Sequence, residues 1–318
     1  MPKISIITTT YKHQDFIAQT IESILSQTFT DWELLIGDDS PDNLTWNIIE
    51  TYVDKYPDKI KAWHHKPNKG IVDNMNFLLE KVSNESEYIA FLEGDDMFTL
   101  NNLEEKIKIF EKNKDVKLIY NNFDYIDKNN SIINKKKTII LSEGKYNLSL
   151  LEFLKLGNPI QSFGVVIIKK ELLLNNFPFI NLDKTNKMFG ALDYYLWTKI
   201  IPNNIIYFLD KPLFLYRLHD NNFIKNISIM NSQIELIYKN IISKTSNKEL
   251  IKTCNFFIYN NKAVSNFFEG TRYKTIKNIF KSFYYNQTKN IIERFGILFL
   301  SCMPNFLKNY VIKKYKSI

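Results

Sequence analysis

Short apolar runs alternate with segments of helical periodicity over the first 120 positions of the chain. The apolar, β-branched runs predict buried strands at 4–10, 32–37, 60–65, 88–92 and 116–120. Helical spacing predicts helices from 16 with Asp15 as N-cap, and over 43–55, 71–82 and 100–112. Strands that alternate with helices predict an α/β fold with a mostly parallel sheet flanked by helices.

The rhythm changes after residue 130. Strands are expected at 138–141, 163–168, 205–209 and 213–217, and helices at 148–156 and 189–200. From about 228 the pattern is helical and rich in Asn, Lys, Ile, Phe and Tyr. We therefore place a boundary near 225, between an α/β domain over 1–225 and a helical region over 226–318.

Composition places the chain among globular proteins. Of its 318 residues, 45% are hydrophobic and 24% are charged, which excludes bulk disorder and collagen-like chains. Two cysteines, Cys254 and Cys302, are too few for a multi-ligand zinc site, and we expect reduced thiols. No signal region and no run of about 18 apolar residues is found, so the expected location is cytoplasmic.

The net charge of +8 is concentrated at the C-terminus. Residues 272–318 contain ten Lys and Arg and one acid, Glu293. Such a segment attracts nucleic acid, anionic lipid or phosphorylated ligands, but no nucleic-acid motif is present and no nucleic-acid partner is expected. The apolar run 295–303 is too short to span a bilayer, which leaves peripheral membrane contact through 272–318 and packing on the domain as alternatives.

Acidic side chains follow two of the predicted strands. Asp38 and Asp39 come after the second strand, and Glu93, Asp95 and Asp96 come after the strand at 88–92. Ligands of open α/β sheets bind outside the carboxyl ends of the strands, so both groups are expected at one crevice. Clustered carboxylates repel one another unless a cation or a hydroxyl group lies between them. A divalent metal or a ribose diol satisfies this requirement.

Five blocks occur in the order that is typical of one enzyme family. They are 4–12 (ISIITTTYK), 21–28 (IESILSQT), 32–40 (WELLIGDDS), 68–70 (NKG) and 88–96 (YIAFLEGDD). In these blocks the sequence resembles the family 2 glycosyltransferases of the GT-A fold, and weaker matches extend to about 220. The resemblance implies a GT-A catalytic domain, with nucleotide-sugar binding in 1–125 and the acceptor side in 126–225, followed by a helical, basic region over 226–318.

The resemblance also implies roles for residues of the donor site. Thr9, Tyr11 and Asp39 match positions that hold the nucleobase, and Asn68 and Gly70 match the loop that lines the nucleotide pocket. Asp95 matches a ribose contact. Asp96 matches the metal ligand, with Glu93 and His219 as further ligands of Mn²⁺ or Mg²⁺. Arg217 matches a contact to the diphosphate. His64 and His65 are expected on a surface strand, without a functional role.

The implied activity is inverting transfer of a sugar from a nucleotide-sugar, with uridine favoured, to a hydroxyl group of a saccharide or lipid-linked acceptor. Asp193 matches the catalytic base that removes the acceptor proton. Such acceptors would place the protein peripherally on the inner face of the cytoplasmic membrane.

Three positions depart from the family pattern. Glu93 stands where Asp is frequent, Met75 where Arg is frequent, and Leu192 where an acid often precedes the base. These departures keep open a catalytically silent nucleotide-sugar-binding protein. A sugar-phosphate nucleotidyltransferase is disfavoured, because such enzymes need a glycine-rich loop and residues 11–15 contain no glycine.

Overall fold

The computed structural model describes residues 3–136, 141–186, 188–220, 222 and 226–285. The chain divides into two compact units, Met1–Asp220 and Asn221–Ile318. The predicted division of 1–225 into a donor side and an acceptor side is a statement about function and stays a prediction.

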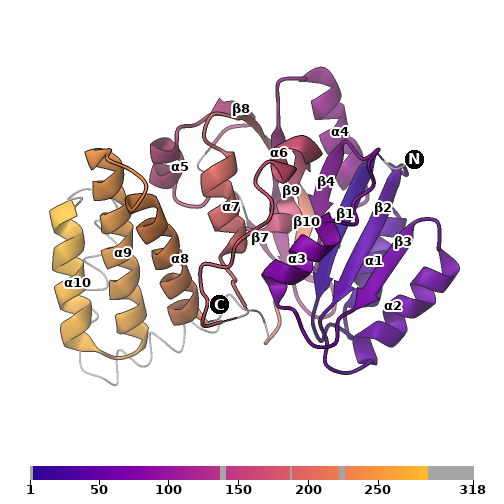
Figure 1. The fold of residues 1–318 in the computed structure, drawn as a ribbon, viewed down its shortest axis with the longest axis horizontal. Helices are drawn as coiled ribbons and strands as arrows, with labels where there is room; N and C mark the ends of the chain where they lie inside the picture. Colours follow the sequence, from indigo (N-terminus) through magenta and orange to yellow (C-terminus); the bar gives the residue numbers. More distant parts are fainter. Residues whose placement is uncertain (1–2, 137–140, 187, 221, 223–225, 286–318) are drawn as a thin grey trace. The chain divides into compact units, whose positions relative to one another are not determined.

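The described residues of the first unit form one mixed sheet of ten strands (Figure 1). The strands are β1 (Ile4–Thr10), β2 (Trp32–Asp38), β3 (Ile60–His64), β4 (Tyr88–Phe91), β5 (Met97–Phe98), β6 (Leu118–Ile126), β7 (Ile132–Lys136), β8 (Gly144–Asn147), β9 (Val166–Lys169) and β10 (Ile205–Arg217). Their order is β3-β2-β1-β4-β9-β6-β10-β5, and β7 and β8 pair with β6 and β10. Strands β3, β2, β1 and β4 are parallel, whereas β9 runs antiparallel to both of its neighbours.

Helices flank this sheet, and the described elements of the second unit are all helices (Figure 1). The helices of the first unit are α1 (Ile17–Leu25), α2 (Leu44–Lys55), α3 (Ile71–Leu79), α4 (Asn102–Lys112), α5 (Leu150–Leu156), α6 (Lys170–Leu174) and α7 (Leu192–Ile200). Those of the second unit are α8 (Ile227–Ile242), α9 (Lys248–Phe268) and α10 (Arg272–Tyr285). The predicted fold class, an α/β sheet flanked by helices with a helical C-terminal region, is confirmed.

The core of the first unit is a set of strands buried on both faces. Every residue of β2 and β4 is buried, and in β1 only Thr9 is partly exposed. Continuous apolar runs of this kind are typical of parallel strands covered by helices on both sides. This is why the pattern at 4–10, 32–37 and 88–92 located these strands so closely.

Several predicted elements differ from the observed ones. Asp15 does not cap α1, which follows Phe16 without a side-chain cap. The segments 205–209 and 213–217 belong to one strand, β10, whose register shifts beside Pro212, a residue without an N–H to donate. The expected strand 163–168 begins as a 3₁₀ turn, Phe163–Val165. Of the expected strand 138–141, residues 137–140 lie outside the described residues.

The fold brings both acidic segments to the carboxyl end of β1. Thr10 pairs with Asp38 of β2, and the Asp39 N–H donates to the Thr10 carbonyl. On the other side of β1, the Gly94 N–H donates to the Thr9 carbonyl at 3.1 Å. The strand β1 therefore holds the two groups of carboxylates on either side of its own end.

The second unit is held together by aromatic packing. Tyr238 of α8 stacks on Phe257 of α9 at 5.5 Å, and Tyr259 of α9 stacks on Tyr285 of α10 at 5.6 Å. Cys254 is a buried free thiol, whereas Cys302 lies outside the described residues. Among the helices that the structure describes, none combines the length and the apolar character needed to cross a membrane.

We predict that Gly37→Ala destabilises the first unit. The buried Asn74 amide of α3 donates to the Gly37 carbonyl at 2.9 Å, and a Cβ at position 37 would overlap that amide. Overpacking of this kind costs about 1–3 kcal/mol, which a urea unfolding series would measure. Because the overlap is with one side chain, the substitution should cost less in an Asn74→Ala background. Equal costs in the two backgrounds would contradict the explanation.

Candidate functional site

Two histidines and one aspartate converge beyond the carboxyl end of β1. His219 Nε2 lies 2.8 Å from Asp95 Oδ2, and His13 Nε2 lies 3.9 Å from the same oxygen. One ligand atom from each of these three residues falls within 4.8 Å of the others. Two imidazoles and a carboxylate are a donor set that binds divalent transition metals, so these residues fit the metal that the sequence implied.

The two histidines decide the charge state of Asp95. Burial raises the pKa of this carboxyl, but the charges of His13 and His219 and a hydrogen bond from His219 lower it by more. Burial also lowers the pKa of His13. An ionised carboxylate is the form in which Asp95 can bind a metal.

The pKa values of the neighbouring acids, Asp96 and Glu93, are shifted in the opposite direction to that of Asp95. Asp96 Oδ1 accepts the Arg217 backbone N–H at 2.8 Å, and burial together with the charges of Asp95 and Glu93 raises the pKa of Asp96 well above its usual value. Burial and the charge of Asp95 raise the pKa of Glu93 to about 8. The expectation that Asp96 and Glu93 bind the metal stays a prediction, and the geometry favours Asp95 as the carboxylate ligand.

Arg217 is fully buried at the end of β10. Its N–H groups donate to the carbonyls of Asp95 and Asp127, to Asn130 Oδ1 and Gln19 Oε1, and to Met97 Sδ. These contacts use all five of its N–H donors. The predicted contact of Arg217 with a diphosphate therefore stays a prediction, because the described arrangement directs the guanidinium at protein atoms.

Asp193 lies in the first turn of α7 and is the expected catalytic base. Burial raises its pKa to about 7, against the hydrogen bonds from the backbone N–H groups of Tyr194 and Asp193. Its charge in turn raises the pKa of Glu93, which places the two carboxyls within electrostatic reach of each other. An acid that titrates near neutrality in such a group is suited to general base catalysis.

Asp39 holds the loop that precedes α3. Its two carboxylate oxygens accept the N–H groups of Lys69 at 3.1 Å and Gly70 at 3.0 Å, and its carbonyl accepts from Asn68 Nδ2 at 3.1 Å. Gly70 has a φ of +83°, a conformation that favours glycine. Asp39, Asn68 and Gly70 are therefore one hydrogen-bonded group, and their assignment to the nucleotide pocket stays a prediction.

The residues at the end of β1 are accessible. Tyr11 is 40% exposed, with Lys12 Nζ 5.5 Å from its ring centroid, and Thr9 is half-buried. An exposed aromatic ring at the edge of a sheet can stack on a planar base. The assignment of Thr9 and Tyr11 to nucleobase binding stays a prediction.

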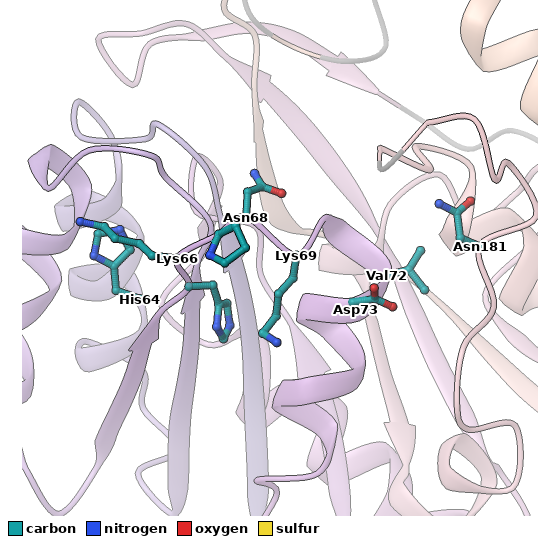
Figure 2. Close-up of a pocket in the computed structure, with 9 residues that line it drawn as sticks. His64, Lys66, Asn68, Lys69, Val72, Asp73 and Asn181 are labelled. Atoms are coloured by element: carbon teal, nitrogen blue, oxygen red, sulfur yellow. The ribbon is translucent and has the colours of Figure 1, made fainter.

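A cavity of about 490 Å³ opens beside this loop. Figure 2 shows its lining residues, which come from the end of β3, the following loop, the start of α3 and Asn181. His64 and His65, expected on a surface strand, line this cavity, and only 7% of His65 is exposed. His64 ends β3 and is partly exposed, as expected, whereas His65 follows the strand and is buried, so the expected surface position is wrong for His65 alone. His64 Nε2 lies 2.9 Å from the Ser40 carbonyl.

Sequence reasoning missed His13. It lies among polar residues directly after β1, a position equivalent to those that singled out the acids, so the signal was present. Met75, which departs from the family pattern, is buried in α3 and packs in the core. The adjacent Asn76 exchanges two hydrogen bonds with the Phe179 backbone.

Known proteins resemble this chain in sequence. The family described as Glycosyl transferase family 2 matches residues 5–177. An Escherichia coli relative, UDP-Glc:alpha-D-GlcNAc-diphosphoundecaprenol beta-1,3-glucosyltransferase WfgD, is 32% identical over 206 residues, which cover 64% of this chain and 71% of the relative. An uncharacterized glycosyltransferase of Rickettsia bellii is 27% identical over 86% of this chain, and the match spans only 38% of that relative's length.

Solved structures share the fold. S. aureus TarS 1–349, determined in complex with UDP-GlcNAc, superposes with a TM-score of 0.63 at 15% identity, over 90% of this chain and 92% of the 1–349 chain. The mannosyltransferase PcManGT from Pyrobaculum calidifontis, in complex with GDP-Man and Mn²⁺, gives a TM-score of 0.58 at 12% identity, over 99% of this chain and 85% of PcManGT. The GT-A fold, the matched family over more than half of the chain and the E. coli relative lead to one conclusion: the chain belongs to glycosyl transferase family 2.

Proposed function

We propose that the chain is a metal-dependent, inverting glycosyltransferase that moves a sugar from a UDP-sugar to a hydroxyl group of a saccharide or lipid-linked saccharide. The observation that carries the proposal is the grouping of Asp95 and His219 with Glu93 at the strand ends, within electrostatic reach of Asp193. His13, Asp95 and His219 are candidate ligands of a divalent metal, and the Asp193 carboxyl has a pKa of about 7, which supports the proposal.

We assign binding of the donor's nucleobase to the loop before α3 and to the end of β1. Tyr11 would stack on the base, Thr9 and Asp39 would contact its edge, and Asn68 and Gly70 would line the pocket. The names of two similar proteins support uridine, since WfgD is named for UDP-Glc and TarS was solved with UDP-GlcNAc. The relative WfgD also supports a lipid-linked acceptor, because its name specifies a diphosphoundecaprenol sugar.

Charge on the departing diphosphate is the main electrostatic demand of the reaction. A divalent ion held by Asp95 and His219 would supply a Lewis acid that neutralises this charge. PcManGT, which shares the fold, was solved with Mn²⁺. Arg217 would hold the segment that carries Asp95 and Asp96 in position. Its backbone N–H donates to the Asp96 carboxyl, and its Nε–H donates to the Asp95 carbonyl.

On the acceptor side, Asp193 would take the proton of the attacking hydroxyl group. A general base contributes roughly 10²–10⁴-fold to the rate of such reactions. Attack from the face opposite to the leaving diphosphate inverts the anomeric configuration. The catalytically silent alternative predicts nucleotide binding without any of this chemistry.

We expect Asp193→Asn to abolish turnover while it preserves donor binding. The amide keeps the size of the carboxyl group but cannot accept the acceptor proton. The assay is release of nucleoside diphosphate from UDP-, GDP- and dTDP-sugars, with Mn²⁺, Mg²⁺ or EDTA and an undecaprenol-linked saccharide acceptor. Calorimetry with UDP would compare donor affinity.

Asp54→Asn is the matched control, because Asp54 is exposed in α2, outside the proposed catalytic group and the cavity beside the loop. Full turnover by Asp193→Asn would remove Asp193 from the mechanism. UDP binding without UDP release under every condition, tested with all three donors, would favour the silent protein.

The rate should rise with pH through about 7. The carboxyl of Asp193 accepts a proton only when ionised, and its pKa is about 7, so kcat at pH 6 should be roughly a tenth of its value on the plateau. Glu93 titrates nearby, with a pKa of about 8. The Glu93→Gln variant separates the two: its kcat profile should keep a midpoint near 7. Loss of that midpoint would show that ionisation of Glu93, and not of Asp193, controls kcat.

We propose further that α10 contacts the cytoplasmic face of the membrane. Three aromatic side chains of this helix are exposed: Tyr273 by 77%, Phe280 by 61% and Tyr284 by 79%. Their spacing of seven and four residues places them on one side of the helix, opposite the buried Thr275 and Ser282. The exposed lysines beside them are Lys274, Lys277 and Lys281. Aromatic rings beside lysines suit the interface of an anionic bilayer.

We expect the full chain to co-sediment with vesicles of phosphatidylglycerol and phosphatidylcholine, and to bind vesicles of phosphatidylcholine alone weakly. Replacing Tyr273, Phe280 and Tyr284 by Ser should reduce binding, because it removes the apolar contact. Exchanging Lys274, Lys277 and Lys281 for Gln should reduce it further, by about 1 kcal/mol per lysine. A matched variant with Ser at the exposed Leu44 and Leu100 of the first unit should bind like the wild type. Unchanged binding by both α10 variants would exclude this face.

A further inference from the structure

His13 has no part in the donor and acceptor contacts proposed above, yet it faces the same carboxylate as His219. Its Nε2 lies 3.9 Å from Asp95 Oδ2, and the two imidazole rings stand nearly perpendicular, at 81°, with centroids 6.1 Å apart. Asp95 thus lies between two imidazoles that come from segments more than 200 residues apart in the sequence.

The fold fixes the position of His13. Its carbonyl accepts the N–H groups of Phe16 and Ile17 at 2.9 and 2.8 Å, which anchors the residue to the start of α1. Its ring lies against Gly94, where an added Cβ would come within 3.0 Å of His13 Nδ1 and within 2.5 Å of Thr10 Oγ1. Glycine between Glu93 and Asp95 therefore provides the space that the His13 ring occupies.

On this basis we propose that His13 is a third protein ligand of the metal, together with Asp95 and His219. The chain would then bind a transition ion such as Mn²⁺ before the nucleotide-sugar arrives, and would discriminate against Mg²⁺. The inference deepens the proposed function and rests on it for the role of the ion in sugar transfer.

The chemistry of the three side chains supports this assignment. Imidazole ligands suit transition ions, whereas Mg²⁺ prefers oxygen ligands and retains its water. Ligand atoms within 4.8 Å of one another need only a small closure to reach a common ion at about 2.1 Å, with metal bonds replacing the His219–Asp95 hydrogen bond.

The test measures metal binding by the full chain without nucleotide. Calorimetry should show one Mn²⁺ bound per chain and no comparable heat with Mg²⁺. His13→Ala should weaken Mn²⁺ binding on the order of tenfold or more, equivalent to about 1.4 kcal/mol. His65→Gln is the matched control: it removes an imidazole outside the cluster and should leave Mn²⁺ affinity unchanged.

A spectroscopic readout counts the imidazoles directly. Electron spin echo modulation of bound Mn²⁺ should show two coordinated ring nitrogens in the wild type, and one in His13→Ala or in His219→Ala. Gly94→Ala, which displaces the ring without removing it, should also lose one nitrogen. This measurement on the wild type decides the matter even where a variant fails to fold: one nitrogen, or no binding without nucleotide, would overturn the inference.

Failure of the inference and failure of the proposed function can be told apart. Asp193→Asn should bind Mn²⁺ like the wild type although it lacks turnover. If sugar transfer depends on the metal but His13→Ala binds Mn²⁺ as tightly as the wild type, only the role of His13 is overturned. A two-nitrogen Mn²⁺ site in a chain that transfers no sugar from any donor would leave His13 a ligand and overturn the proposed function.

Discussion

The buried guanidinium of Arg217 is the interaction on which the arrangement of the site depends. It joins the end of β10 to the segment after β4, to Gln19 in α1 and to the turn at Asp127 and Asn130. Its backbone N–H binds Asp96 as well. His219 follows two residues later, and its contact with Asp95 is possible because Arg217 has already fixed the chain there. A lysine has only three donors on a single nitrogen, so it cannot satisfy acceptors that lie in several directions.

A second constraint is the charge at the strand ends. Glu93, Asp95 and Asp96 are largely buried together, and burial, together with repulsion between the carboxyls, raises the pKa of Glu93 and of Asp96. Asp95 stays ionised because two histidines face it. Such a group costs stability in the unliganded protein, since buried carboxyls lose their hydration. Cations and hydroxyl groups of a ligand would offset that cost, so ligand binding should stabilise the buried cluster of carboxyls.

How far the site could be read from the sequence depended on the distance over which its residues interact. Asp38, Asp39, Glu93, Asp95 and Asp96 were found because each directly follows an apolar strand, and the carboxyl ends of parallel strands meet at one edge. The choice of Asp96 over Asp95 as metal ligand could not be tested in this way. The contacts that distinguish these two adjacent side chains come from Arg217, at the end of β10, and from His219 just after it, more than 100 residues away.

The α/β class, the buried parallel strands, the acidic strand ends and the family could all be predicted from the chain's local periodicity and contiguous motifs. The three-dimensional structure was needed to show that two apolar segments join in β10, that His65 is buried beside a cavity, and that His13 and His219 lie on either side of Asp95. The physical reason is the same in each case. Burial and ligand geometry come from contacts between segments far apart in the chain, whose energies local sequence patterns do not encode.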